Sequence, residues 1–367
     1  MTNWIPMLAL PHVVTTDPIE ANGIALVAGH DRRLRQLTST HPNFSAFLSR
    51  FWDEFGGQIA PSVVIWRDDL PNSARTFEAL SGFRDAIALS IIPYAWARVQ
   101  SYNRPQGIRY SEWFSFYPWM IDKDYKYIIA QTYSVLALHQ VEKLHAQSIP
   151  CVSHEVIQAH DIDKPLLDSL LSRWEARFCV ETPTVADVAL FRSLNMAHAS
   201  AMQPTQAGTT TYDSGRSISL WASAFEILTP SRNNAYGKIL QLLKAPKWEN
   251  GKNTSATYKT YGTGTPQPLP CWLYGELHQA RNDFLHGNEI KSSHLSAPSG
   301  RNIFYYASIL YRMALAGYLG LQWTKPMPSS EDAKAFGTYI AEQLEYKSYQ
   351  RLFERALATI LEPPDDD

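Results

Sequence analysis

The segment Arg281-Asn282-Asp283-Phe284-Leu285-His286 combines two side-chain types that can act together on a phosphodiester. Transesterification of RNA needs a group that takes the 2′-OH proton or gives a proton to the leaving oxygen, and a cation beside the phosphorane. The imidazole of His286 and the guanidinium of Arg281 can fill these roles without a metal ion. The two residues lie about 140° apart around a regular helix. One chain therefore does not direct both side chains at one phosphate unless the helix end deforms.

These residues also resemble a family motif. The pattern R-x4-6-H at the end of the third helix is typical of HEPN domains, small helical bundles found in RNA-cleaving toxins, RNA-guided ribonucleases and bacterial defence proteins. Asn282 follows the arginine, where that family commonly has a polar residue. The segment 219–228, which contains Glu226, resembles the second helix of the ApeA-like HEPN ribonuclease branch. The resemblance covers about residues 181–323.

The resemblance implies a fold, an activity and a set of site residues. The fold is a helical bundle that forms a homodimer, so that two motifs face each other across a cleft. The activity is metal-independent endoribonucleolytic cleavage of single-stranded RNA, which leaves a 2′,3′-cyclic phosphate. The implied catalytic residues are Arg281, Asn282 and His286, and Glu226 is a supporting residue. Such a protein acts as a cytoplasmic toxin-like or anti-phage defence effector, with RNA and a second copy as partners.

Three alternatives accompany this interpretation. His286 can serve only as a helix cap, the domain can be a non-catalytic HEPN adaptor that binds RNA or a nucleotide, or the bundle can be a scaffold that only dimerises. Two other pairs match the looser spacing of the motif, Arg35 with His41 and Arg192 with His198. The first pair lies in a predicted loop. The second lies inside a predicted helix, where His198 is expected to pack or to face solvent.

Other catalytic and metal-binding patterns are incomplete. His154 and His160 do not have the spacing of a zincin helix, since they point about 240° apart on a helix. Asp283 with Glu289 and Lys291 suggests a metal-dependent nuclease, but that chemistry needs carboxylates on neighbouring strands and this segment is a predicted helix end. The sequence contains no P-loop, dinucleotide-binding or G-x-S-x-G motif, and its three cysteines form no C-x-x-C pair. We therefore expect neither a metal site nor a cofactor.

A basic segment within residues 231–270 is a second candidate feature. Residues 231–260 contain six lysines and arginines against a single acidic residue, and aromatic residues lie between them. Basic groups beside aromatic faces suit single-stranded nucleic acid. The predicted substrate-binding residues are Lys238, Lys244, Lys247, Trp248 and Lys252. The alternative is a solvated charged loop with a few packed aromatics.

The elements that must position these residues fall into three predicted regions. Residues 1–178 mix strand-like and helical patterns, which predicts an α+β domain of unknown fold that senses a trigger or regulates. Residues 179–326 predict an all-α HEPN-like helical bundle with a basic insert at 231–270, and residues 327–367 predict an amphipathic helix and an acidic tail. In the first region, the expected strands are 23–29, 62–66 and 113–117, the expected helices are 44–55 and 74–92, and a turn is expected at 122–124.

Capping signals delimit the helices of the second half. Thr184 and Asp187 have the spacing of a capping box, Gly287 is a natural helix end, and Asp332 precedes the last amphipathic pattern. The expected helices are 184–202, 215–228, 272–286, 303–321 and 332–361.

The chain is near neutral and carries no expected membrane span. Among its 367 residues, 33 are basic and 35 are acidic, giving a net charge of −2. The most apolar stretch, residues 303–321, has Arg312 at its middle, where a charge is costly in a bilayer. We therefore predict a buried bundle helix there. The first residues lack the basic region of a signal peptide, so we expect a cytoplasmic protein without a membrane partner.

Overall fold

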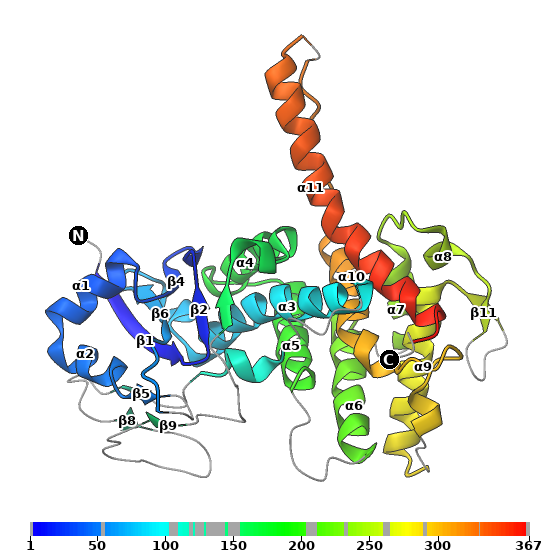
Figure 1. The fold of residues 1–367 in the computed structure, drawn as a ribbon, viewed down its shortest axis with the longest axis horizontal. Coiled ribbons are helices and arrows are strands. Elements are labelled where there is room, and N and C mark those ends of the chain that lie inside the picture. Colours follow the sequence, from blue (N-terminus) through cyan, green and yellow to red (C-terminus); the bar gives the residue numbers. More distant parts are fainter. Residues whose placement is uncertain are drawn as a thin grey trace. The chain divides into compact units, whose positions relative to one another are not determined.

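The chain forms two compact units (Figure 1). Unit 1 comprises residues 1–88, 110–162 and 170–187, and unit 2 comprises residues 89–109, 163–169 and 188–367. An N-terminal α+β part is followed by a mostly helical part, as predicted. The computed structural model describes residues 3–52, 56–102, 109–116, 120–121, 128–129, 144–145, 155–202, 211–230, 234–259, 265–288, 292–329 and 331–364.

A four-stranded antiparallel sheet lies at the centre of unit 1, with the strand order β1-β6-β4-β3. The predicted strands at 23–29 and 62–66 are confirmed as β4 and β6. The first five residues of β6 are buried, in agreement with its largely apolar sequence. The four strands are β1 (Trp4–Leu10), β3 (Ile19–Ala21), β4 (Ile24–Val27) and β6 (Ser62–Arg67).

Two short helices, α1 (Arg32–Thr40) and α2 (Pro42–Leu48), share a buried apolar cluster with this sheet. The predicted helix at 44–55 is correct only as far as Leu48. The chain then enters the short strand β5 (Phe51–Trp52), and the rings of Phe47 and Phe51 meet edge to face with their centroids 5.3 Å apart. The regular spacing of phenylalanines thus continues through a helix and a strand that contribute to one core.

Helices α3 (Phe77–Tyr102) and α4 (Lys164–Phe178) contribute residues to both units. The predicted helix at 74–92 is confirmed in α3, which continues through Pro93. The expected strand at 113–117 is wrong, because Ser111–Phe114 form the 3₁₀ helix η2. Phe114 and Phe116 are both buried, so that their alternation imitates a strand pattern.

The remaining elements of unit 1 are short. Strand β2 pairs with β10 in parallel, β5 pairs with β9 in parallel, and β7 pairs with β8 antiparallel. The expected turn at 122–124 lies outside the described residues. These elements are β2 (Val13–Thr15), β7 (Met120–Ile121), β8 (Ile128–Ile129), β9 (Leu144–His145), β10 (Glu155–Ile157), η1 (Asn72–Ala74) and η3 (Ala159–Asp161).

Helices dominate unit 2, and all five predicted helices of the second half are present. They correspond to α5 (Val185–Ser200), α6 (Thr211–Leu228), α9 (Leu269–Leu285), α10 (Ala307–Leu319) and α11 (Ala333–Ala358). The short elements among them are β11 (Tyr258–Lys259), β12 (Pro266–Gln267), η4 (Ser292–Leu295), η5 (Ile303–Tyr306) and η6 (Thr359–Leu361).

Side-chain caps set several helix ends where the sequence predicts them. Thr184 Oγ1 accepts the backbone N–H of Asp187 at 3.1 Å and donates to its carboxylate, which starts α5. Asp332 accepts the backbone N–H of Ala335 at 2.9 Å at the start of α11. Gly287 follows the C-cap of α9 with a φ of 72°, in the left-handed region that favours glycine.

The described residues of the predicted insert at 231–270 include two helices. Residues Ala235–Lys244 form helix α7, whose Ile239 and Leu243 are buried, and Gly251–Thr254 form the short helix α8. Gly317 of α10 permits the close approach of α7, since a Cβ atom there would overlap the carbonyl oxygen of Leu242. The apolar face of α7, which repeats at helical spacing, makes this stretch part of the bundle.

Arg312 lies inside the buried helix α10, as expected. It is 3% exposed, and its Nε donates to Oδ2 of the fully buried Asp163 at 2.7 Å. The guanidinium carbon also lies 4.3 Å from the ring centroid of Phe353. The charge in the middle of this apolar helix is therefore paired inside unit 2.

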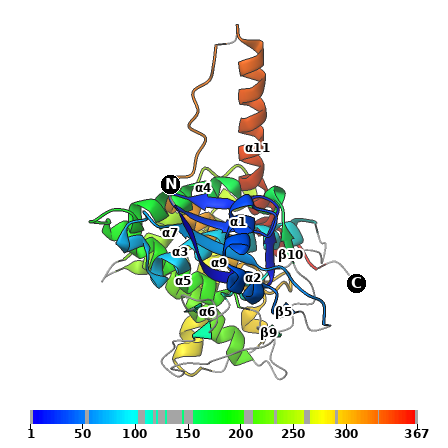
Figure 2. The ribbon, with the colours of Figure 1, turned by 90° about the vertical axis from the view of Figure 1, so that its left-hand side faces the viewer.

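The fully buried side chains of helix α11 lie in its C-terminal part, whereas Tyr339 and Tyr346 in its middle lie against Trp323. The buried residues of α11 begin at Leu352, and Figures 1 and 2 show its first turns extending away from the other helices of this unit. Among the described residues, no helix has both the length and the apolar character needed to cross a bilayer.

Candidate active site

Helices α6 and α9 pack side by side and position the predicted site residues. Gly215 of α6 lies against the ring of Phe284 on α9, and a Cβ atom at position 215 would overlap that ring. The buried rings of Phe225 on α6 and Tyr274 on α9 lie with their centroids 5.1 Å apart. These contacts fix the side of α9 that faces α6.

A charged cluster lies between these two helices. Arg281 Nη2 is 3.9 Å from Glu226 Oε2, and Arg281 Nη1 donates to Oδ1 of Asn282 at 3.0 Å. His278 lies one turn before Asn282, with its Nε2 3.9 Å from Glu226 Oε1. The structure therefore brings together three of the predicted residues, Arg281, Asn282 and Glu226, and adds His278 to them.

Burial lowers the pKa of His278 below the usual value for histidine, with Glu226 opposing and Arg281 reinforcing this shift. The neutral imidazole is therefore favoured. The ring atom Nδ1 lies 3.3 Å from Nδ2 of Asn282, which assigns Nδ1 as the acceptor and places the hydrogen on Nε2, towards Glu226. The cluster thus holds one cation, one carboxylate and one neutral imidazole.

Two tyrosines border this cluster. The ring centroid of Tyr236 lies 5.1 Å from that of His278 and 5.6 Å from that of Tyr274. Burial raises the pKa of Tyr274 well above its usual value. Among the described residues, the buried Tyr274 hydroxyl and the buried Nε of Arg281 have no hydrogen-bond partner.

His286 lies at the exposed C-terminal end of α9. It is the C-cap residue, and its backbone N–H donates to the carbonyl of Asn282 at 3.0 Å, while that of Asn288 donates to Asp283 at 2.9 Å. Within the described part of the chain, its imidazole forms no hydrogen bond or ion pair. Helix α9 remains regular through Leu285, so the end does not deform in a way that would turn Arg281 and His286 towards one phosphate.

The predicted RNA-binding lysines do not form one cluster of contacts. Lys238 is exposed on α7, whereas Lys244 donates to Oε1 of Gln267 at 3.3 Å and Lys252 pairs with Glu362 at 3.1 Å. Lys247 is exposed in the connection between α7 and α8. The neighbouring Trp248 is half-buried, and its Nε1 donates to the carbonyl of Leu243 at 2.9 Å.

The two alternative Arg/His pairs lie in other surroundings. Arg192 is exposed on α5, while His198 on the same helix is only 8% exposed. Arg35 lies in α1 rather than in a loop, and His41 lies at the junction of α1 and α2. The pair with an exposed histidine at a helix end next to a charged cluster remains Arg281 and His286.

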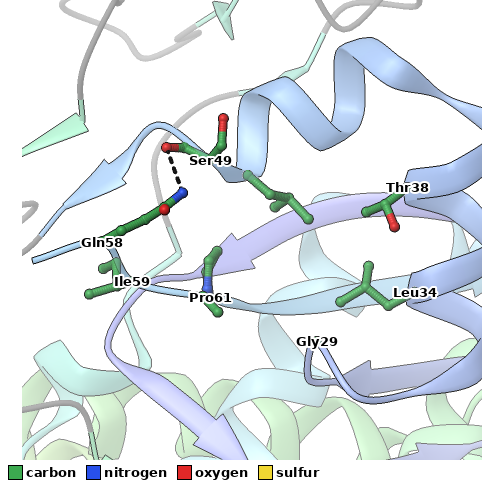
Figure 3. Close-up of a pocket in the computed structure, with 9 residues that line it drawn as sticks. Gly29, Leu34, Thr38, Ser49, Gln58, Ile59 and Pro61 are labelled. Carbon is green, nitrogen blue, oxygen red and sulfur yellow. Dashed lines mark hydrogen bonds between the residues drawn. The ribbon is translucent and has the colours of Figure 1, made fainter.

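Groups of metal ligands and cavities are two other kinds of possible site. Within the described ranges, no group of three or more His, Cys, Asp or Glu side chains has the arrangement needed to hold a metal ion. Unit 1 contains a cavity of about 390 Å³, whose walls include Leu34, Ile59 and Pro61 (Figure 3). At its edge Gln58 Nε2 donates to the carbonyl of Ser49 at 3.1 Å, and none of its lining residues is charged.

Comparisons with protein-family models, with curated proteins and with solved structures found no match for this chain.

Sequence reasoning missed His278, Tyr236 and Tyr274. The signal for His278 was present, because it lies three residues before Arg281 and four before Asn282 in a helix that the sequence predicts. Tyr274 precedes His278 by one further turn on the same face. Tyr236 could not be placed, because it lies in α7, the helix that was interpreted as part of an insert.

Proposed function

We propose that the protein is a metal-independent HEPN endoribonuclease that cleaves single-stranded RNA and acts as a toxin-like or anti-phage defence effector. The observation that carries the proposal is the arrangement on α9. Arg281 and Asn282 form a polar cluster with Glu226, and the same helix ends in the exposed imidazole of His286, which has no partner among the residues that the structure describes. Unit 1 would receive the trigger that activates cleavage.

The reaction follows from these groups. The ribose 2′-oxygen attacks phosphorus as its proton passes to the imidazole of His286. The imidazolium then gives that proton to the 5′-oxygen as the bond between phosphorus and this oxygen breaks. The products are a 2′,3′-cyclic phosphate and a 5′-hydroxyl. The Arg281 guanidinium stabilises the charge that develops on the phosphorane oxygens. Glu226 orients the guanidinium, and Asn282 holds it through the 3.0 Å hydrogen bond.

A homodimer completes the site in this proposal. Within one regular helix, Arg281 and His286 are separated by about 140° and by about 7.5 Å along the axis. Two copies of α9 across a two-fold axis place the arginine of one chain opposite the histidine of the other. Such a dimer would assemble two equivalent sites from four side chains.

Cleavage in the presence of EDTA tests the proposal. The purified protein should cut a single-stranded RNA, and Arg281→Ala and His286→Ala should each abolish the cut while thermal melting stays nearly unchanged. Replacing the RNA with a 2′-O-methyl substrate should also stop cleavage, since the attacking hydroxyl is then blocked. The matched control is the pair Arg192→Ala and His198→Ala.

Three outcomes would contradict the proposal. If the first two variants melt at clearly lower temperature but keep their activity, Arg281 and His286 are structural. If RNA binds in a mobility-shift assay but is never cut, the protein is a non-catalytic adaptor. Cleavage of DNA or of the 2′-O-methyl substrate would exclude the 2′-OH mechanism.

A further inference from the structure

A cavity in unit 2, with a volume of about 520 Å³, lies among the α7–α8 connection, the C-terminal end of α10 and the middle of α11. We call it the α11 pocket. Its volume falls within the range of small-molecule sites. The side chains that define its chemistry are Lys247, Trp248, Gln322, Trp323, Tyr346 and Lys347.

The buried carboxylate of Glu354 fixes the wall of this pocket that the α7–α8 connection forms. Glu354 is 2% exposed, and it accepts the backbone N–H of Glu249 at 2.9 Å and that of Asn250 at 2.6 Å. Gln350 donates to the same carboxylate at 2.7 Å and also to the carbonyl of Lys247. The segment that carries Lys247 is therefore held on α11 by several hydrogen bonds, and the pocket is preformed.

Three aromatic residues, Trp248, Trp323 and Tyr346, contribute to the lining, and Tyr339 lies behind Trp323. The ring centroid of Trp323 lies 5.6 Å from that of Tyr339 and 5.6 Å from that of Tyr346, so the three rings support one another. The Trp248 ring is anchored by its bond to Leu243. The Trp323 indole N–H is buried and, among the described residues, has no acceptor. Anchored rings of this kind provide rigid surfaces on which a planar group can stack.

The charges at the α11 pocket favour an anion. Within the described residues, neither Lys247 nor Lys347 has an ion-pair partner. The one acidic lining residue, Glu249, is paired with Arg351, whose Nε lies 2.7 Å from its Oε2. The two ammonium groups are therefore not neutralised by the wall of the pocket, in contrast to the uncharged cavity of unit 1.

We propose that the α11 pocket binds a nucleoside phosphate. The base stacks on the aromatic lining, Gln322 is available to the polar edge of the base, and Lys247 and Lys347 bind the phosphates. A purely apolar ligand would leave the lysines unused, and a cation would be repelled by them. The nucleotide is either free in solution or an unpaired nucleotide of an RNA chain. The site uses neither Arg281 nor His286, so it is separate from the proposed cleavage site.

Binding of ATP that carries a fluorescent N-methylanthraniloyl group on its ribose tests the proposal by fluorescence anisotropy. The double variant Lys247→Gln/Lys347→Gln should raise the Kd by about tenfold or more, since it removes both phosphate contacts. The matched control is Lys334→Gln, which changes an exposed lysine of α11 outside the lining. It should leave the Kd unchanged, and circular dichroism should show that each variant is folded.

A competition experiment separates the contribution of the base to binding from that of the phosphates. Unlabelled ATP should displace the probe at lower concentration than inorganic triphosphate, because only ATP can stack. Equal competition by the two would show a simple anion site and overturn the proposal. The proposal would also be overturned if the double variant changed neither the Kd for the ATP probe nor the Kd for RNA.

A labelled single-stranded RNA of about twelve nucleotides distinguishes the sources of the ligand. Weaker binding of the ATP probe alone in the double variant identifies a free nucleotide, and weaker binding of the RNA alone identifies a nucleotide within RNA. Lys334→Gln should bind both probes as the wild type does. A protein that fails to cleave RNA can therefore still confirm the α11 pocket, and the two proposals fail independently.

Discussion

The imidazole of His278 couples the charged cluster of unit 2 to pH. Because burial lowers its pKa in the folded state, the unfolded chain, with a pKa near 6.5, binds the proton more tightly. Well above pH 6.5 both states are neutral at this residue, and its titration does not change stability. Below that value the unfolded chain takes up the proton first, so the free energy of unfolding falls as the pH falls.

Replacing His278 with glutamine should therefore flatten the acid side of the stability profile. The wild type should lose stability between about pH 7 and about pH 5, and His278→Gln should lose clearly less. Urea unfolding at both pH values measures this. Leu285→Gln, which places the same amide at the exposed end of α9, is the matched control and should follow the wild type. An identical pH dependence in His278→Gln and the wild type would show that this imidazole does not titrate differently on unfolding.

The pair of Asp163 and Arg312 supplies a second test at the level of single residues. Arg312→Met leaves the fully buried Asp163 carboxylate without its cation, and should lower the free energy of unfolding by about 3–5 kcal/mol. Adding Asp163→Asn should recover part of the loss, because the amide oxygen can still accept the N–H of Leu166. Denaturant unfolding of the two variants measures both effects. If the double variant is less stable than Arg312→Met, the carboxylate stabilises the fold without Arg312.

At the scale of elements, the approach of α6 to α9 depends on Gly215. Gly215→Ala places a methyl group against the Phe284 ring, so the helices must separate or the ring must move, at a cost of about 1–3 kcal/mol. Gly337 in α11 has open space around its Cβ position, and Gly337→Ala should stabilise the chain by about 0.5–1 kcal/mol through helix propensity. Opposite shifts of the melting temperature are expected. Equal shifts would contradict a steric role for Gly215.

The helices of unit 2 could be predicted where a capping residue and apolar residues at helical spacing indicated the same helix. Thr184 with Asp187, Asp332 and Gly287 mark ends that the structure confirms. Helix α7 was not predicted, because the interpretation of 231–270 was based on its lysines. The spacing of Ile239 and Leu243 already indicated a helix there. Composition thus outweighed periodicity in the interpretation of this helix.

Contacts between side chains that lie far apart in the chain could not be predicted from the sequence. Arg312 was recognised as a charge in an apolar helix, but nothing in the sequence singles out Asp163 as its partner. Asp163 directly precedes α4 and Arg312 lies in α10, so the two residues are far apart in the chain. Glu226 was linked to Arg281 through the resemblance alone, and the structure supplies the 3.9 Å contact. In unit 1 the alternation of Phe114 and Phe116 led to the wrong prediction of a strand at 113–117. Alternate residues can be buried without pairing to another strand.

For the whole molecule, the proposed activity depends on a second copy of the chain. In a regular α9, the Arg281 and His286 side chains diverge, so an Arg/His pair at one phosphate must come from two chains. A mixed dimer of Arg281→Ala and His286→Ala keeps one intact pair, formed by the histidine of the first chain and the arginine of the second. Neither chain retains both side chains, so a site built within one chain stays inactive in this mixed dimer.

Co-expression of the two variants with different affinity tags, followed by two-step purification, isolates the mixed dimer. It should cleave RNA at about half the wild-type rate per dimer, because one of two symmetric sites is intact. Each variant purified alone should be inactive, and a mixed dimer in which both chains carry His286→Ala is the matched control. Activity in the first mixture and none in the control requires a site shared between chains. An inactive first mixture, despite a confirmed dimer, would place Arg281 and His286 of one chain at the same phosphate and demand a rearrangement of the end of α9.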